Sequence, residues 1–296
     1  MKAAYQLYDL ESKPTSQGTY EHCWVSPKVH RNSWNRPGAV HSDWHTADGK
    51  HAIHDEGSLE YFEYALQSSL LTPLPNQAEL DPPNHRLERQ DLKIGGIKLD
   101  CIKVIPKMPL NGHLQIVPLG LFPTYCFDEG SPILRIEYSW GSLGIEYNKI
   151  VKVQDHYLPR EITIFGGKRK ILTASVDVIE GITTSAPVLT PPPNATTVTT
   201  DKVQLTSEIS NGMNLKTVVP IYPQDAKDAQ VSGRVVLRGI IGPDGVVHDL
   251  QIVETPWPSL AASALWSVSQ WHYKPYLLNG EPVEVETTFN VIYTLG

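Results

Sequence analysis

Five of the eleven histidines lie close together in the chain, where they could form a metal site: His30, His41, His45, His51 and His54. A zinc site needs three or four ligands that converge in a tetrahedral arrangement. On a strand, His41 and His45 share a face but lie about 13 Å apart at about 3.3 Å per residue, which is too far for one ion without help from another strand. We therefore interpret these side chains as exposed histidines of strands and loops, and we expect neither a metal ion nor another cofactor.

Three cysteines raise the question of redox chemistry. Cys101 and Cys126 each lie in a β-rich segment, whereas Cys23 stands apart. An odd count leaves at least one thiol free or intermolecular. If Cys101 and Cys126 face each other on neighbouring strands, a bridge between them would contribute about 3 kcal/mol in an oxidising compartment. The alternative is three buried thiols, and the sequence leaves both interpretations open.

Motifs of the common enzyme classes do not occur in this sequence. There is no HExxH, no GxSxG, no P-loop and no dinucleotide fingerprint. Carboxylate pairs such as Asp155 and Glu161 have the ordinary explanation of solvated surface charge. The net charge is -7, and no basic stripe is present that would suit a phosphate backbone. We expect a binding or interaction protein that is not an enzyme and takes no nucleic acid.

The elements that must position any site begin with residues 1–182, which have the pattern of antiparallel β structure. Short alternating runs such as KLDCIKVIP and ILRIEYSW recur between Gly, Pro, Asn and Asp residues. Gly166 and Gly167 mark one hairpin turn. Residues 58–70 have near-helical apolar spacing and stop before Pro73. The pattern predicts a curved sheet with one helix against it.

Residues 183–210 are rich in Thr, Ser and Pro, which is the composition of a linker. After them, residues 211–296 predict a second, smaller domain, so the whole chain is expected to be α+β. A short helix follows Pro223, two strands are joined at residues 242–245, and a helix over 259–271 has Ser259 as its expected N-cap.

The closing strand begins after a turn at Asn279 and Gly280 and alternates with great regularity. Such alternation is typical of a half-buried strand. No proline follows Pro282 and no glycine interrupts the run before its last residue, so its edge could accept another chain. One face carries Val283, Val285, Thr287, Phe289, Val291, Tyr293 and Leu295, and the other carries Glu284, Glu286, Thr288, Asn290, Ile292 and Thr294.

Residues 215–296 resemble the C-terminal domain of the TonB family, periplasmic proteins that pass energy from the inner membrane to outer-membrane receptors. The matches, in chain order, are Tyr222 with Pro223, Gly233, the strand 235–241, Asp244 with Gly245, Ala261 with Ala262, Val268, Trp271, Lys274 with Pro275, Asn279 with Gly280, and Pro282 with Val283.

The resemblance implies two helices on a three-stranded antiparallel sheet, with a receptor's TonB box added as a further strand beside the last one. It also implies inner-membrane energising proteins as partners, and the same edge would suit a homodimer. The implied partner-binding residues are Val219, Ile221, Tyr222, Val283, Glu284, Val285, Glu286, Thr287, Thr288, Phe289, Asn290 and Val291.

Four features depart from the family pattern. In the best-studied kind of TonB, a glutamine three residues before the Tyr-Pro pair contacts the receptor. The matching residue in this sequence is Val219. The sequence shows no membrane anchor and no long proline-rich spacer, and its longest apolar stretches fall far short of the roughly 18 residues that a spanning helix needs. The start also lacks the pattern of an export signal. Because the family is periplasmic, we expect a signal or anchor upstream of Met1.

The N-terminal region is similar in topology to the lipoprotein-carrier half-barrels, in which a curved sheet wraps a helix around an apolar cavity. This similarity implies an alternative function, a periplasmic carrier of a lipid or another apolar ligand. A cavity in residues 1–182 would favour this alternative, and a fully packed core would oppose it.

Overall fold

A computed structural model describes residues 1–75, 85–106, 122–138, 143–183, 185–198, 203–206, 210, 212–278 and 281–295, without the side chains of residues 54–56, 106 and 281. The expected turn at Asn279 and Gly280 lies outside the described residues. Mixed α+β structure, dominated by strands, is confirmed.

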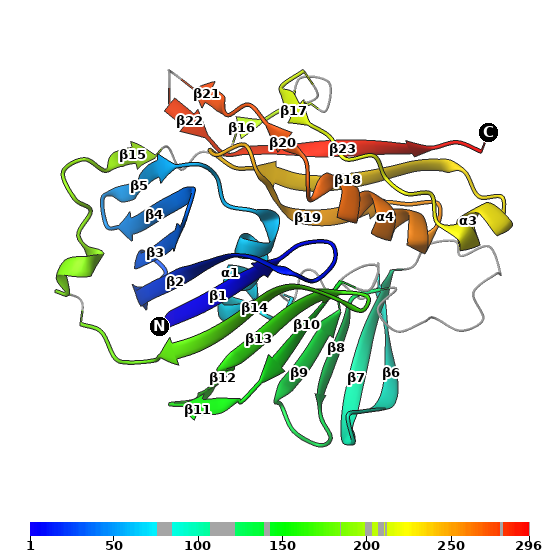
Figure 1. Cartoon of the computed structure of the whole chain (residues 1–296), viewed down its shortest axis with the longest axis horizontal. Coiled ribbons are helices and arrows are strands. Elements are labelled where there is room, and N and C mark those ends of the chain that lie inside the picture. Colours follow the sequence, from blue (N-terminus) through cyan, green and yellow to red (C-terminus); the bar gives the residue numbers. More distant parts are fainter. Residues whose placement is uncertain are drawn as a thin grey trace.

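The N-terminal region forms one large sheet in which all neighbouring strands are antiparallel. Figure 1 shows the sheet curving beneath the C-terminal region. The hairpin predicted at Gly166 and Gly167 is confirmed, and Gly167 has the positive φ of the turn (62°). The strands are β1 (Lys2–Tyr8), β2 (Pro14–Ser26), β3 (Val29–Arg36), β4 (Ala39–Thr46), β5 (Gly49–Glu56), β6 (His85–Ile94), β7 (Ile97–Pro106), β8 (Thr124–Asp128), β9 (Leu134–Tyr138), β10 (Leu143–Asn148), β13 (Glu161–Gly166), β14 (Arg169–Val178) and β15 (Thr196–Val198).

Their spatial order is β15-β5-β4-β3-β2-β1-β14-β13-β10-β9-β8-β7-β6. The strands β11 (Val151–Val153) and β12 (His156–Leu158) form a small separate hairpin. Since β1 pairs with both β2 and β14, the two ends of the N-terminal region meet in the middle of the sheet.

The helix predicted at 58–70 is present as α1 (Tyr61–Leu71). A capping box of Glu60 and Glu63 starts it, as expected for a sequence with an acidic residue at the third helical position. Its apolar side packs on the curved sheet, where Leu66, Leu70 and the preceding Leu59 join a core with Tyr5, Trp34, Ile162, Ile164 and Leu172.

A buried ion pair fixes α1 to the sheet. The Glu63 side chain is fully buried, and its carboxylate accepts hydrogen bonds from Arg36 Nε (3.0 Å), Arg36 Nη2 (3.2 Å) and the Tyr5 hydroxyl. Burial and the neighbouring Glu63 charge raise the pKa of Tyr5 well above its usual range. A buried charge is tolerated only when it is paired and hydrogen-bonded, and here each carboxylate oxygen has a partner.

The C-terminal region is a second sheet with two helices on one face (Figure 1). Its antiparallel strands are β18 (Gly233–Ile241), β19 (Val247–Glu254) and β23 (Val285–Tyr293), and its helices are α3 (Gln224–Asp228) and α4 (Pro258–Val268). The expected N-cap was wrong by two residues: Trp257 caps α4, because Pro258 is suited to the first helical position, and Ser259 lies inside the helix.

The segment 183–210 is tied to both sheets. After the 3-10 helix η2 (Pro187–Leu189), β15 pairs with β5 and β16 (Val203–Gln204) pairs in parallel with β23. The small sheet is therefore four-stranded, in the order β16-β23-β18-β19, where the resemblance implied three strands. Two small pairs complete the fold: β17 (Asn214–Lys216) with β20 (His272–Tyr273), and β21 (Tyr276–Leu278) with β22 (Glu281–Val283).

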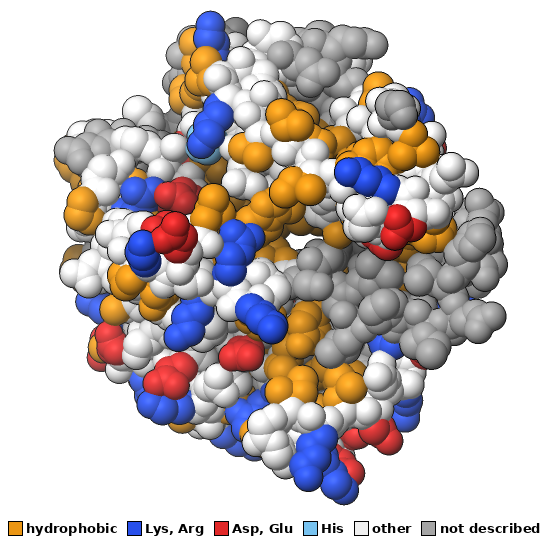
Figure 2. All heavy atoms as spheres, turned by 45° about the vertical axis from the view of Figure 1, so that its right-hand side comes forward, with side chains coloured by type: hydrophobic (Ala, Val, Ile, Leu, Met, Phe, Trp, Pro, Cys, Tyr) orange, Lys and Arg blue, Asp and Glu red, His pale blue; other side chains and the backbone are white. Residues whose placement is uncertain are grey.

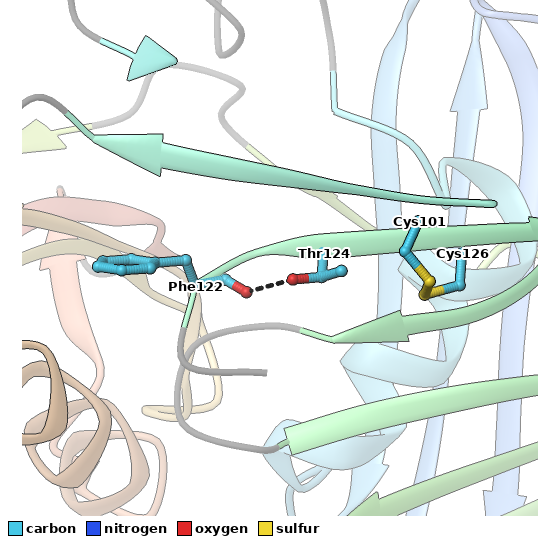
Figure 3. Close-up of a disulfide and its surroundings, with 4 residues drawn as sticks. All are labelled: Cys101, Phe122, Thr124 and Cys126. Atoms are coloured by element: carbon cyan, nitrogen blue, oxygen red, sulfur yellow. Dashed lines mark hydrogen bonds between the residues drawn. A yellow bond between two sulfur atoms is a disulfide. The ribbon is translucent and has the colours of Figure 1, made fainter. Parts of the chain in front are cut away.

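Cys101 and Cys126 lie directly opposite each other on β7 and β8 and form a disulfide, with 4.0 Å between their Cα atoms (Figure 3). Both are buried in a small cluster with Leu99 and Ile136. Cys23 is a buried free thiol whose pKa is raised by burial.

The two sheets meet through α1 and α4. The Trp266 ring of α4 packs 5.8 Å from the Phe62 ring of α1, and the Arg169 guanidinium lies 5.3 Å above Trp266. Tyr64 of α1 stacks on His248 of β19 and donates a hydrogen bond to Asp244 (3.0 Å). In the described part of the chain, no helix is both long and apolar enough to cross a membrane.

Candidate partner-binding site

The alternation predicted for the closing strand is present in β23. Val285, Thr287, Phe289, Val291 and Tyr293 are buried, and the residues between them are partly or fully exposed. The buried face packs with α4 and the inner strands of the domain. Leu295 lies beyond the strand and is 42% exposed, so it does not belong to that face.

One edge of β23 is fully paired. Its neighbour β18 runs antiparallel beside it in unbroken register, from Gly233 opposite Tyr293 to Ile241 opposite Val285. The register has no bulge, so successive residues of β23 direct their main-chain groups alternately to the inner and outer edges.

The outer edge of β23 is covered only at its start. The amide of Val203 donates to the Glu284 carbonyl (3.0 Å), and the amide of Leu205 donates to the Glu286 carbonyl (3.1 Å). Residues 284 and 286 therefore face outward, and by alternation so do Thr288, Asn290 and Ile292. In the described part of the chain, no strand pairs with β23 on this side beyond Glu286.

Side chains reinforce the covered part of the edge. The Thr287 hydroxyl donates to the Leu205 carbonyl (2.9 Å) and lies 3.2 Å from the Ser210 hydroxyl. Gln204 Nε2 donates to Glu286 Oε2 (3.3 Å). An ion pair also connects the large sheet to the start of this edge: Lys50 Nζ of β5 lies 3.4 Å from Glu284 Oε1.

A second exposed surface comes from the segment before α3. The carbonyl of Val218 accepts hydrogen bonds from Ser267 and from Trp271 Nε1 (3.0 Å), which ties the segment to α4 and the residues after it. Val219 and Ile221 consequently point away from the core and are 83% and 79% exposed. Tyr222 is partly buried, and its ring lies 5.3 Å from that of Tyr293 at the end of β23.

The structure narrows the set of residues expected to contact a partner. Val283, Val285, Thr287, Phe289 and Val291 are buried, so their side chains are not available to a partner. The last four also direct their main chain toward β18. The outward-facing members are Glu284, Glu286, Thr288 and Asn290. Ile292, which was not in the predicted set, also faces outward and is 70% exposed.

His30, His41, His45 and His51 are partly buried, so the expectation of exposed side chains was wrong for these four, and the side chain of His54 lies outside the described part of the structure. His30, His41 and His45 line a cavity of about 350 Å³ between β3, β4 and the C-terminal sheet. The rings of His30 and His45 stack at 4.0 Å, and burial together with the nearby His30 lowers the pKa of His45. In the described ranges, no group of three or more candidate ligands has metal-binding geometry.

A larger hollow lies at the junction of the two sheets. This junction cavity, of about 630 Å³, has Tyr61, Phe62 and Trp266 in its wall and Lys170 and Lys216 among its basic groups. Figure 2 shows one face of the molecule hollowed near its centre, with hydrophobic side chains around the opening and Lys and Arg side chains beside it. The junction cavity combines aromatic surface with positive charge.

Comparison with known proteins identifies the C-terminal part of the chain. Residues 218–295 match the family model described as Gram-negative bacterial TonB protein C-terminal. This match confirms the resemblance for those residues, including the segment from Val218 to α3, α4 and β23. No curated protein matches the chain significantly.

Two solved structures are similar to parts of the chain. The solution structure of the Pseudomonas aeruginosa TonB C-terminal domain is 24% identical, and the match covers 28% of this chain and 84% of that one, with a TM-score of 0.25. The crystal structure of a proposed outer membrane lipoprotein-sorting protein domain from Vibrio parahaemolyticus is 11% identical, and the match covers 60% of this chain and 82% of that one, with a TM-score of 0.33. Both TM-scores are low, so we base the assignment of the C-terminal domain on the family match alone.

Proposed function

We propose that the C-terminal domain binds an extended segment of a partner protein by strand addition to the outer edge of β23. The observation that carries this proposal is the outward-facing main chain of Thr288, Asn290 and Ile292, which has no neighbouring strand in the described residues. The family match to residues 218–295 supports an outer-membrane receptor as the partner and its TonB box as the added strand.

The chemistry of the edge suits this mode of binding. An added strand gains main-chain hydrogen bonds, which are insensitive to side-chain identity, while alternate side chains provide selectivity. Val219 and Ile221 add exposed apolar surface near the far end of β23, next to Tyr222. Because the whole patch is small, the complex should be weak and transient, as suits a partner that must be released.

Proline substitution on β23 tests the proposal. Asn290→Pro removes an outward-facing amide and leaves the pairing with β18 intact, so a TonB-box peptide should lose at least about tenfold in affinity, while the fold is retained. Asn290→Ala is the matched control and should bind as the unmodified chain does. Isothermal titration of the full chain measures both, and equal affinity of the proline variant would refute strand addition at this edge.

We further propose a periplasmic location and a role in energy-coupled transport, with inner-membrane energising proteins as additional partners. The disulfide between Cys101 and Cys126 supports an oxidising compartment, because such bonds rarely persist in a reducing cytosol. A homodimer through the same edge would compete with the receptor. We place the domain boundaries at 1–182 and 211–296, with 183–210 as the connecting segment.

A second candidate function is ligand binding by the junction cavity. Its aromatic wall and basic groups favour an organic anion with an apolar body over a purely apolar lipid. An anionic aromatic probe, 8-anilinonaphthalene-1-sulfonate, should then bind the full chain and lose affinity severalfold in Lys216→Glu, whereas Lys28→Glu, far from the cavity wall, should bind as before. Unchanged affinity in Lys216→Glu would remove this candidate.

A further inference from the structure

The strand β16 lies where a partner strand would be added. It runs parallel to β23 with Val203 opposite Val285 and Gln204 opposite Glu286. The amides of Val203 and Leu205 donate hydrogen bonds to the carbonyls of Glu284 and Glu286. These bonds use the outward-facing carbonyls of Glu284 and Glu286, which belong to the edge assigned above to the partner.

Side chains of this segment alternate as those of an added strand should. Val203 and Leu205 are partly buried, and Leu205 packs against the core of the C-terminal domain. Gln204 and Thr206 are exposed, and Gln204 reaches the Glu286 carboxylate. The segment therefore fills two apolar positions, at Val203 and Leu205, and offers one polar donor at Gln204.

We propose that residues 203–206 are an intramolecular occupant of the partner site, and that a partner strand replaces them on β23. The inference rests on the proposed function and adds to it the direction and pattern of the partner. An incoming strand would run parallel to β23. It would place apolar side chains where Val203 and Leu205 lie and a hydrogen-bond donor where Gln204 meets Glu286.

The occupant is short enough to be displaced. β18 pairs with β23 at nine positions in unbroken register, whereas β16 pairs at two. Parallel pairing is also slightly less stable per residue than antiparallel pairing. An incoming strand that continued past Glu286 would gain the outward groups of Thr288, Asn290 and Ile292, which β16 does not use.

The chain keeps the occupant close to its site. Residues 196–198 form β15, which pairs with β5 at three positions, and Lys50 of β5 is ion-paired with Glu284. A tethered strand has a high effective concentration, so it lowers the apparent affinity of any competitor without new contacts. Release of residues 203–206 would leave β15 in place.

The experiment compares the unmodified full chain with two proline variants, each of which lacks one main-chain amide of the segment. Leu205→Pro removes the donor to the Glu286 carbonyl, whereas the amide of Thr206 faces away from β23, so Thr206→Pro is the matched control. The probes are a synthetic peptide with the sequence of residues 201–208, DKVQLTSE, and a receptor TonB-box peptide, each followed by fluorescence anisotropy.

Leu205→Pro should bind both peptides about tenfold more tightly than the unmodified chain, because the tethered competitor is weakened, and Thr206→Pro should bind like the unmodified chain. Hydrogen exchange in the unmodified chain gives a second measurement: saturating peptide should speed exchange of the Val203 and Leu205 amides. This second measurement does not depend on how Leu205→Pro folds.

Three results would be decisive against parts of this proposal. Equal, measurable affinities in all three proteins, with unchanged exchange at Val203 and Leu205, would overturn the occupant and leave strand addition standing. Tighter binding in Thr206→Pro as well would assign the effect to general loosening of the segment and would also overturn it. Absence of binding in every protein would overturn the proposed function and the occupant together.

Discussion

The buried carboxylate of Glu63 and the outer edge of β23 are both polar, but they differ in hydrogen bonding. Both oxygens of the carboxylate have partners, whereas the edge is paired along only part of its length. Under α1, both oxygens of Glu63 are bonded, to Arg36 and to the Tyr5 hydroxyl. Along β23, the described strands pair with the outer edge only as far as Glu286. Unpaired polar groups are costly in the interior but not at an edge that water can reach.

This difference separates the residues that maintain the fold from those available to a partner. The N-terminal region pairs the buried Glu63 carboxylate with Arg36 and adds the disulfide between Cys101 and Cys126. The C-terminal region keeps part of one strand edge open and holds the rest with a two-residue strand. Substitutions in the first region should therefore change stability, and substitutions in the second should change binding.

The largest effect is expected at the buried ion pair. Arg36→Ala leaves the Glu63 charge buried without its cation, with the Tyr5 hydroxyl and the Glu60 amide as remaining donors. Removal of one partner from a buried pair typically costs about 3–5 kcal/mol of unfolding free energy. Urea denaturation measures the loss, and the affinity of the folded fraction for a TonB-box peptide should not change.

Arg234→Ala is the control for that change. Arg234 pairs with Glu254 at 3.2 Å, but both side chains are more than half exposed, so its loss should change stability by less than about 1 kcal/mol. If the two arginine variants were equally stable, the contrast between the buried and the exposed polar regions would fail.

An intermediate case is Glu137 on β9, a half-buried carboxyl that accepts a hydrogen bond from the Tyr147 hydroxyl (2.8 Å). Burial raises the pKa of Glu137 from about 4.5 to about 7, against the opposing effect of the Tyr147 hydrogen bond. The folded state therefore holds this proton more tightly than the unfolded state. Its contribution to stability is complete below about pH 4.5 and is lost as the pH rises through 7.

Glu137→Gln removes this pH dependence. At 1.36 kcal/mol per pKa unit, the unmodified chain should lose about 3 kcal/mol from this group between pH 4.5 and pH 8, and the variant should not. Urea denaturation at several pH values within that range measures the difference. Parallel stability profiles for the two proteins would show that Glu137 is not held protonated.

The smallest effect on stability is expected at the exposed pair Val219 and Ile221. Their side chains are 83% and 79% exposed, so replacing both by Ser should change the unfolding free energy by less than about 0.5 kcal/mol for each residue. The affinity for an intact receptor should nevertheless fall, and that for a short TonB-box peptide should stay the same. A large loss of stability would place these residues in the core instead of at the partner surface.

Regular elements with a clear period could be predicted from the sequence. Leu59, Leu66 and Leu70 indicated α1, and the alternation from Val285 to Tyr293 identified the buried face of β23. These patterns are local, so a single stretch of sequence contains the signal.

Three features of the site could not be predicted. β16 has only two residues in a Thr/Ser-rich stretch, too few for a period, and its partner lies 82 residues further along the chain. The direction of each β23 amide depends on which edge β18 occupies, so Asn290 could not be distinguished from Val291. The packing of Trp266 on Phe62 joins two separate regions of the chain. The sequence pattern of each region predicts its own secondary structure but not a contact with the other region.

The most direct test of strand addition is an NMR titration of the isotope-labelled full chain with a receptor TonB-box peptide. The largest amide shifts should fall on β23 at Glu286, Thr288, Asn290 and Ile292 and on the β16 residues that are displaced, with little change on β19 or around Glu63. Shifts that cluster elsewhere, or none at saturating peptide, would contradict the assignment of this edge as the partner site.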